Sequence, residues 1–182
     1  MKGLENAIRN LDILDTRMVP QASAWAINRV AQKAISQATR QVARDTVAGD
    51  NQMKGIPLKL VRGRVRMLSA SPSGKMYARI RINRGNLPAI KLNTTRRRAG
   101  DGLRVGKYFF RGAFIRQLAN GRWHVMRRID GKNRYPIDVV KIPLSGPLTQ
   151  AFEDARKSVI DNEMPKQLGY ALKHQLRSYL NL

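Results

Sequence analysis

The positive charge of this chain is concentrated in its middle. Residues 53–134 hold 22 Lys and Arg against only Asp101 and Asp130, which gives +20 of the total net charge of +23. A surface shaped by solubility interleaves both signs and avoids a large single-sign field. The block therefore indicates a nearby polyanion, which could be nucleic acid, an anionic membrane or an acidic protein surface. The nearly neutral flanks, residues 1–52 and 135–182, are expected to supply scaffold and interfaces.

Length and composition favour one globular domain. The chain has 182 residues and is 42% hydrophobic, enough for a core. It has no cysteine, which excludes a disulfide framework and Cys-based zinc sites and fits a reducing compartment. No stretch approaches 18 apolar residues, so no membrane span is predicted. The first residues lack the apolar core of a signal peptide, so the protein is expected in the cytoplasm of the cell that makes it.

Helical periodicity marks the N-terminal part. Leu4, Ile8 and Leu11 predict a short helix that ends around residues 15–16, and Pro20 suits the first position of a longer helix. Residues 21–47 then carry two opposite faces. The apolar face holds Ile27, Ala31, Ala34, Ala38 and Val42. The basic face holds Arg29, Lys33, Arg40 and Arg44. This basic face is either simply solvated or follows phosphates.

The spacing of apolar residues changes in the middle of the chain. Residues 57–67 predict a short basic helix, weakened by Gly63, with a strand as the alternative. Residues 76–83 alternate apolar and basic side chains, and residues 89–93 predict a second strand. Residues 94–111 predict a mobile basic loop. Asn120-Gly121 predicts a hairpin between residues 113–118 and 122–129, and Asp130-Gly131 a turn into residues 134–142.

The C-terminal part is helical again. Residues 147–180 predict a helix with an apolar face of Leu148, Phe152, Ala155 and Val159, and Pro165 is expected to kink or restart it. The predicted fold is α+β, with helices from residues 1–48 and 147–180 packed on an antiparallel sheet of about four or five strands within residues 76–142. The whole chain is expected to form one domain.

No pattern in the sequence indicates catalysis. The twelve carboxylates are scattered, and His124 and His174 lack a metal-ligand spacing. No glycine-rich phosphate loop follows a strand. We therefore expect no enzyme activity, catalytic residue, metal, cofactor or small-molecule substrate.

The aromatic residues allow two interpretations. Trp25 and Trp123 are expected in the core. Residues 108–110, Tyr-Phe-Phe, are expected to close the basic loop against the protein body or a neighbouring subunit, and stacking on bases is the alternative.

Several long runs resemble a known family. They are RINRGNLPAIKL (residues 81–92), GAFIRQLANGRWHVM (112–126), GKNRYPIDVVKIP (131–143), AINRVA (26–31) and LGYAL (168–172). These runs closely resemble the minor tail protein Z family of lambda-like phages, and they match in place and order along nearly the whole chain.

The resemblance implies a tail completion protein of a long, non-contractile phage tail. Such a protein acts late in tail assembly at the end that joins the head and is needed for placing genome DNA in the tail. The implied partners are other tail proteins (terminator and tube), genome DNA bound without sequence preference, and further copies of the chain. The implied location is the virion tail, with the host bacterial cytoplasm during assembly. A stand-alone nucleic-acid-binding protein is the alternative.

The candidate site residues follow from the charge pattern and the terminal apolar stripe. The positions expected to contact DNA phosphates are Arg29, Lys33, Arg40, Arg44, Arg62, Arg64, Arg66, Arg79, Arg81, Arg96, Arg97, Arg98 and Arg104. The positions expected at a subunit interface are Leu168, Leu172, Leu176 and Tyr179.

Overall fold

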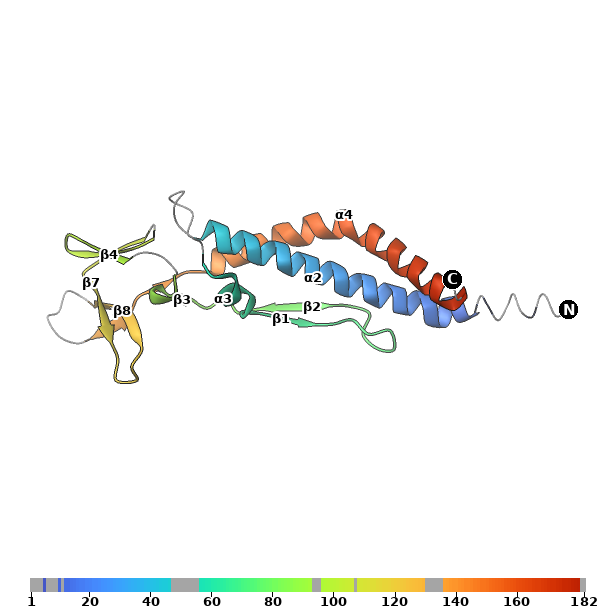
Figure 1. Cartoon of the computed structure of the whole chain (residues 1–182), viewed down its shortest axis with the longest axis horizontal. Helices are drawn as coiled ribbons and strands as arrows, with labels where there is room; N and C mark the ends of the chain where they lie inside the picture. The colour runs from blue at the N-terminus through green and yellow to red at the C-terminus, as the bar shows by residue number, and fades with distance from the viewer. Residues whose placement is uncertain are drawn as a thin grey trace. The chain divides into compact units, whose positions relative to one another are not determined.

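The computed structural model describes residues 12–46, 56–92, 96–106, 108–129 and 136–180, with residues 5 and 10; for residues 96–98 and 180 it describes the backbone alone. In chain order the elements are η1 (Leu14–Met18), α2 (Val19–Asp45), α3 (Leu58–Arg62), β1 (Val65–Leu68), β2 (Arg79–Ile82), β3 (Leu87–Pro88), η2 (Ala89–Lys91), β4 (Arg96–Ala99), β5 (Gly102–Val105), β6 (Tyr108–Arg111), β7 (Ala113–Gln117), β8 (Trp123–Arg128), β9 (Ile137–Val139), β10 (Lys141–Ile142) and α4 (Ser145–Leu180) (Figure 1). Long helices towards both ends, with antiparallel strands between them, confirm the predicted α+β class.

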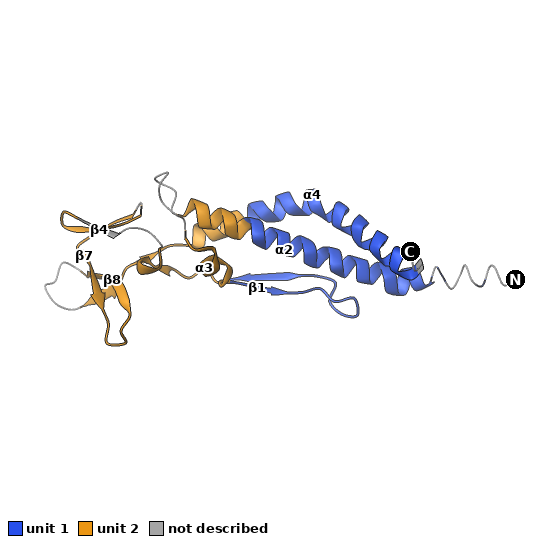
Figure 2. Cartoon of the chain, viewed as in Figure 1, with its two compact units in different colours: residues 1–37, 65–82, 152–182 blue, residues 38–64, 83–151 orange. Residues whose placement is uncertain are grey.

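Contacts between residues divide the chain into two compact units (Figure 2). Unit 1 comprises residues 1–37, 65–82 and 152–182, and unit 2 comprises residues 38–64 and 83–151. The helices α2 and α4 each contribute residues to both units. That the chain behaves as one domain stays a prediction.

Small side chains mediate the helix contact in unit 1. Ala22 and Ala26 of α2 form a buried cluster with Ala171 of α4, and Met164, Leu168 and Leu172 pack against it. Alanines at a contact let two helix axes approach closely, because axial separation depends on the side chains between them. Lys33 contacts Glu163, so later residues of α2 meet earlier residues of α4 and the pair is antiparallel.

The predicted apolar faces of both long helices are confirmed. Ala31, Ala34, Ala38 and Val42 of α2 are buried, and Ile27 is half-buried. Leu148, Phe152, Ala155 and Val159 of α4 are also buried. The alanine contact of unit 1 is a further apolar surface, and the periodicity of residues 27–42 alone does not reveal it.

The helix does not break before Pro20, contrary to the prediction. Leu14–Met18 form a π-helical turn that continues into α2. Proline lacks the N–H that would reach back four residues to the Thr16 carbonyl, and a widened turn is one way a helix accommodates such a site. Thr16 also donates its hydroxyl to the Asp12 carbonyl at 2.6 Å. Leu4, Ile8 and Leu11 lie outside the described residues.

The helix α4 runs without interruption through Pro165, from Ser145 to Leu180. It therefore starts two residues earlier than predicted and does not restart at the proline. Its part in unit 1 curves along its length (Figure 2), as expected where a proline removes one intrahelical hydrogen bond.

The predicted meander is present in unit 2. Strands β7, β8 and β9 form one antiparallel sheet, in which Gln117 lies opposite Trp123. Gly121 has φ of 74°, the left-handed conformation that the Asn120-Gly121 turn requires. The predicted Asp130-Gly131 turn lies outside the described residues.

The predicted basic loop, residues 94–111, is largely sheet. Strands β4, β5 and β6 pair as an antiparallel meander. Leu103 and Val105 are buried while Arg104 between them is exposed, which is the alternation of a half-buried strand. The arginine-rich composition predicts a loop, but the alternation of Leu103, Arg104 and Val105 indicates a strand.

Three further predictions in the middle of the chain are corrected. The helix predicted for residues 57–67 ends at Arg62, where the Gly63 N–H bonds to the Lys59 carbonyl, and β1 follows. Residues 89–91 form the 3-10 turn η2 instead of a strand, because the Leu92 N–H closes back on the Ala89 carbonyl. The described strands form separate small antiparallel sheets of two or three strands, not one sheet of four or five.

The close helix contact generates a stability prediction. We expect Ala26→Leu to lower the free energy of unfolding by about 1–3 kcal/mol, because the longer side chain forces α2 and α4 apart. Gln37→Leu, at an exposed position of α2, is the control. Thermal unfolding followed by circular dichroism measures both variants. Equal melting temperatures for wild type and Ala26→Leu would contradict the close contact.

Candidate nucleic-acid interface

The β1–β2 hairpin has one half-buried face and one basic face. Val65 and Met67 of β1, like their partners Ile82 and Ile80 of β2, are half-buried. Residues directly opposite each other in an antiparallel pair point to the same face. The exposed face therefore carries the remaining positions, which are Arg66, Leu68, Arg79 and Arg81.

Two like charges lie opposite each other on this face. Arg66 is the register partner of Arg81, and neither guanidinium has a hydrogen bond or ion pair with another described residue. Like charges in directly opposed positions destabilise a strand pair. The hairpin therefore carries an electrostatic cost that a bound anion would offset.

Arg79 extends the basic face towards an aromatic ring. Its guanidinium lies over the Tyr77 ring, 5.6 Å from the centroid. Tyr77 is 46% exposed, and Lys75 in the preceding turn is also exposed. The exposed side of the hairpin thus combines three arginines, one lysine and one aromatic ring.

One asparagine ties the hairpin to α2 within unit 1. The Asn28 Oδ1 accepts the Ala70 N–H at 2.8 Å, and the Asn28 Nδ2 donates to the Ala70 carbonyl at 3.0 Å. Ala70 is the buried residue that follows β1 closely. The pair of bonds satisfies both backbone groups of Ala70. Sequence reasoning missed this contact, because nothing local distinguishes Asn28 from a solvated polar residue on a helix.

Arg64 has a structural role instead of a free charge. Its guanidinium donates to the backbone carbonyls of Asn83, Gly85 and Asn86. The Asn83 N–H in turn donates to the Arg64 carbonyl at 2.8 Å. Arg64 therefore holds the segment that leaves β2, and its donors are not all available for phosphate.

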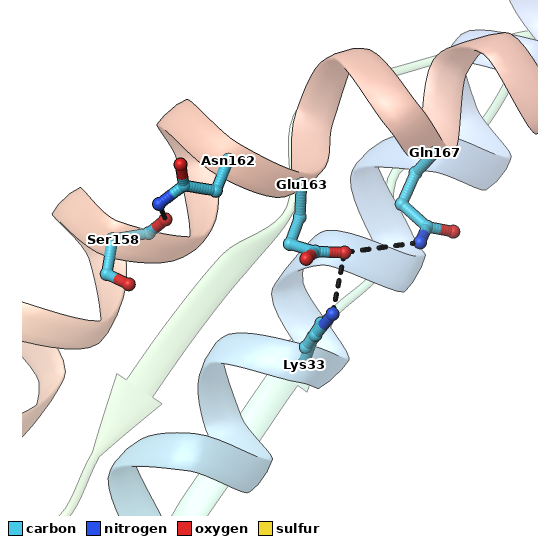
Figure 3. Close-up of polar contacts among 5 residues, drawn as sticks. All are labelled: Lys33, Ser158, Asn162, Glu163 and Gln167. Atoms are coloured by element: carbon cyan, nitrogen blue, oxygen red, sulfur yellow. Dashed lines mark hydrogen bonds and ion pairs between the residues drawn. The ribbon is translucent and has the colours of Figure 1, made fainter.

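The predicted basic face of α2 is partly used by the helix contact. Arg29, Lys33, Arg40 and Arg44 are all exposed. At about 100° per residue, however, Lys33 lies only about 20° around the helix from Ala26. The Lys33 Nζ lies 2.6 Å from the Glu163 Oε2 of α4 (Figure 3). Lys33 is therefore already neutralised, and Arg29 lies over Trp25 with its guanidinium 5.9 Å from the ring centroid.

The hydrogen bond from Lys33 is the main reason why the pKa of Glu163 lies below its ordinary value. A second contribution comes from Gln167, whose Nε2 lies 3.5 Å from the same carboxylate oxygen (Figure 3). Burial opposes both effects. The geometry holds Glu163 ionised at neutral pH.

The remaining predicted basic positions lie on unit 2. Arg62 is exposed at the end of α3, and Arg104 is exposed on β5 opposite Arg97 in register. Arg96 and Arg98 belong to β4, and their side chains, like that of Arg97, lie outside the described residues. Which of these positions contacts DNA stays a prediction.

The predicted subunit interface is divided. Leu168 and Leu172 pack against the alanine cluster of unit 1 and so belong to the interior of this chain. Leu176 and Tyr179 are 41% and 46% exposed. The Tyr179 hydroxyl donates to the Asn10 Oδ1 at 3.1 Å. A subunit contact at this stripe therefore stays a prediction that rests on Leu176 and Tyr179.

The aromatic predictions have mixed outcomes. Trp25 and Trp123 are 48% and 55% exposed, so their expected place in the core is wrong. Tyr108 closes its sheet against the protein body as expected, with its hydroxyl donating to the Thr46 carbonyl at 3.0 Å. Burial raises the pKa of this phenol. Phe110 stacks near Tyr108, whereas Phe109 is 46% exposed.

A cleft of about 400 Å³ in unit 2 lies beside Tyr108, between the end of α2 and the first turns of α4. Among the described residues, its lining includes Asp45 but no lysine or arginine. Within the described residues no cluster of three or more His, Asp or Glu could hold a metal ion. No helix in the described part of the chain is long and apolar enough to cross a membrane.

Comparisons with known proteins agree along the full chain. The family model described as Prophage minor tail protein Z (GPZ) matches residues 1–182. The tail completion protein Z of Escherichia phage lambda is 48% identical over 97% of this chain and 96% of its own length. A tail completion protein of Escherichia phage N15 is 47% identical over 99% of this chain and 98% of its own length. No solved structure matches the chain.

The lowered pKa of Glu163 predicts a pH-dependent effect of Glu163→Gln. The ionised carboxylate stabilises the folded state above the unfolded pKa, and this contribution is lost as pH falls through the lower, folded pKa. The variant should therefore melt below wild type at pH 7, and the difference should vanish in acid below both pKa values. Asp161→Asn, at an exposed position of α4, is the control. A melting difference that does not change with pH would contradict the ion pair.

Proposed function

Because the chain belongs to the prophage minor tail protein Z family, we propose that it is a structural protein of a long, non-contractile phage tail and acts late in tail assembly. It completes the head-proximal end of the tail, to which the head is joined. The observation that carries this proposal is the extent of the match to tail completion proteins. At 48% identity over 97% of this chain and 96% of the lambda protein, almost no part of either sequence is left for a separate role.

The proposed partners follow from this place in the tail. The chain contacts other tail proteins, such as the terminator and the tube, and further copies of itself. It is made in the host cytoplasm and ends in the virion tail. Its role is structural and needs no catalytic group or cofactor.

The proposed role includes contact with genome DNA through the basic surface. DNA carries a regular row of phosphates, and cations that neutralise them bind without reading the base sequence. The exposed arginines Arg66, Arg79, Arg81 and Arg104 support this part of the proposal. So does the net charge of +23 for the chain, which far exceeds what solubility needs.

Duplex DNA binding should depend on salt and not on sequence. If about six to eight phosphates are neutralised, the logarithm of the binding constant should fall with the logarithm of salt concentration with a slope of about −5 to −7. Fluorescence anisotropy with duplexes of unrelated sequence measures this slope. Strong preference for one sequence, or affinity that ignores salt, would contradict a phosphate contact. Binding by the isolated monomer with no affinity for tails would instead favour a stand-alone nucleic-acid-binding protein.

Tail completion should require the exposed end of α4. We expect the wild-type protein, added to tails that lack it, to restore infectious particles after heads are supplied. A Leu176→Asp, Tyr179→Asp variant should stay folded yet fail, because it places charges in a contact between copies around the tail axis. Ile160→Asp, at another exposed apolar position of α4, is the control.

Sedimentation and a melting curve check the oligomeric state and folding of each variant. Full activity of the Leu176→Asp, Tyr179→Asp variant would remove these residues from the interface and leave the tail role intact. Failure of the wild-type protein to restore particles would contradict the tail role itself.

A further inference from the structure

We infer that the exposed face of the β1–β2 hairpin, with Arg66, Arg79 and Arg81, is the surface that binds the phosphates of duplex DNA. This inference rests on the proposed contact with genome DNA and narrows it to one element. The candidate positions are spread over several elements, and the contacts of Lys33 and Arg64 remove these two from the set.

The first argument is the availability of the charges. Lys33 is paired with Glu163, and Arg64 donates to backbone carbonyls. In contrast, the guanidiniums of Arg66 and Arg81 have no hydrogen bond or ion pair with any other described residue. A guanidinium with all its donors free can make two parallel hydrogen bonds to one phosphate, a geometry that a satisfied guanidinium cannot offer.

The second argument is the cost of the arrangement. Arg66 and Arg81 face each other in register, and Arg79 lies two residues before Arg81 on the same face. No carboxylate of the described residues forms an ion pair with them. Repulsion between the two opposed arginines destabilises the free hairpin. Binding of an anion is therefore favoured both by direct attraction and by relief of this repulsion. A single-sign row also fits DNA better than a protein surface, because protein surfaces interleave both signs.

The third argument is the shape of the element. Strands β1 and β2 form a two-stranded sheet of their own. The major groove of DNA is about 12 Å wide and admits a two-stranded β-ribbon. The outward side chains of the strands are arginines and Leu68. A ribbon that lies along the groove with its guanidiniums on the bordering phosphates neutralises charge without reading base edges.

The fourth argument is that the surface is held in place. Both Asn28–Ala70 hydrogen bonds fix the end of β1 against α2. A ribbon already ordered in the free protein loses less conformational entropy on binding than a loop that must fold onto its ligand. The Tyr77 ring beneath the Arg79 guanidinium further restricts that side chain.

The test compares two triple variants with the same change in net charge. Arg66→Gln, Arg79→Gln, Arg81→Gln removes the hairpin charges. Its control, Arg156→Gln, Lys157→Gln, Lys173→Gln, removes three exposed charges from α4 in the same unit. We expect the hairpin variant to lose about three units from the magnitude of the salt slope and to bind about a hundredfold more weakly at 0.1 M salt. The control should change affinity by less than about threefold.

The hairpin variant should fold, because it removes like charges from an exposed face, and we expect a melting temperature at or above that of wild type. A second measurement needs no variant. An arginine-modifying dicarbonyl reagent, followed by mass spectrometry, should label Arg66, Arg79 and Arg81 of the wild-type protein, and duplex DNA should protect them more than Arg156.

The outcomes separate this inference from the proposed function. If wild type binds DNA and both triple variants bind it as tightly as wild type, the hairpin inference is wrong and another surface of the protein contacts DNA. If wild type fails to bind duplex DNA at all, both the DNA contact and the hairpin inference are wrong. If the hairpin variant binds DNA like wild type but no longer attaches to tails, the face binds an acidic tail protein, and the inference is overturned in favour of that partner.

Discussion

The close contact between α2 and α4 sets the positions of the other side chains in unit 1. Ala22, Ala26 and Ala171 present only methyl groups, so the two helices can approach until longer side chains beside the contact reach across. That proximity lets Lys33 meet Glu163 and lowers the pKa of the carboxyl group. The contact between the helices therefore neutralises Lys33 within the chain.

Helix α2 also holds the β1–β2 hairpin, through a different face. Asn28 follows Ala26 by two residues, about 200° around the helix, so the surface that meets α4 and the side chain that holds Ala70 point in nearly opposite directions. The packing against α4 and the hydrogen bonds to Ala70 therefore use different faces of α2. The outer side of the hairpin is consequently left with arginines that scaffold contacts do not use.

The sequence predicted most where a long period repeats. The α+β class, the apolar faces of α2 and α4 and the β7–β8 hairpin rest on patterns of eight residues or more, or on a turn dipeptide with strict backbone requirements. Short alternations of apolar and charged residues were not recognised as strands where charged residues dominate the composition. Residues 94–111 appeared as a loop because arginines outnumber the buried Leu103 and Val105, although two alternating apolar residues suffice to seat a four-residue strand.

The candidate site was only partly predictable, because the role of an arginine depends on partners distant in sequence. Arg64 and Arg66 are alike in chemistry and two residues apart, yet the first bonds to carbonyls of residues 83–86 and the second faces Arg81 across the strand pair. No local pattern tells them apart. The exposed tryptophans show the same limit, because Trp123 begins β8 in the register pair nearest the Asn120-Gly121 turn, where it is exposed.

The distribution of charge has a consequence for assembly. A surface with a strong single sign repels other copies of itself, which opposes any closed arrangement around an axis. In this chain the long C-terminal helix carries both signs on its exposed positions, as with Arg156 and Asp161, whereas the exposed face of the hairpin carries Arg66, Arg79 and Arg81 without a carboxylate. In the proposed assembly, copies approach through the mixed-charge helices, and DNA between the hairpins relieves their mutual repulsion. The proposed DNA contact and the proposed contact between copies then favour each other, because each copy added brings more cations to the same polymer.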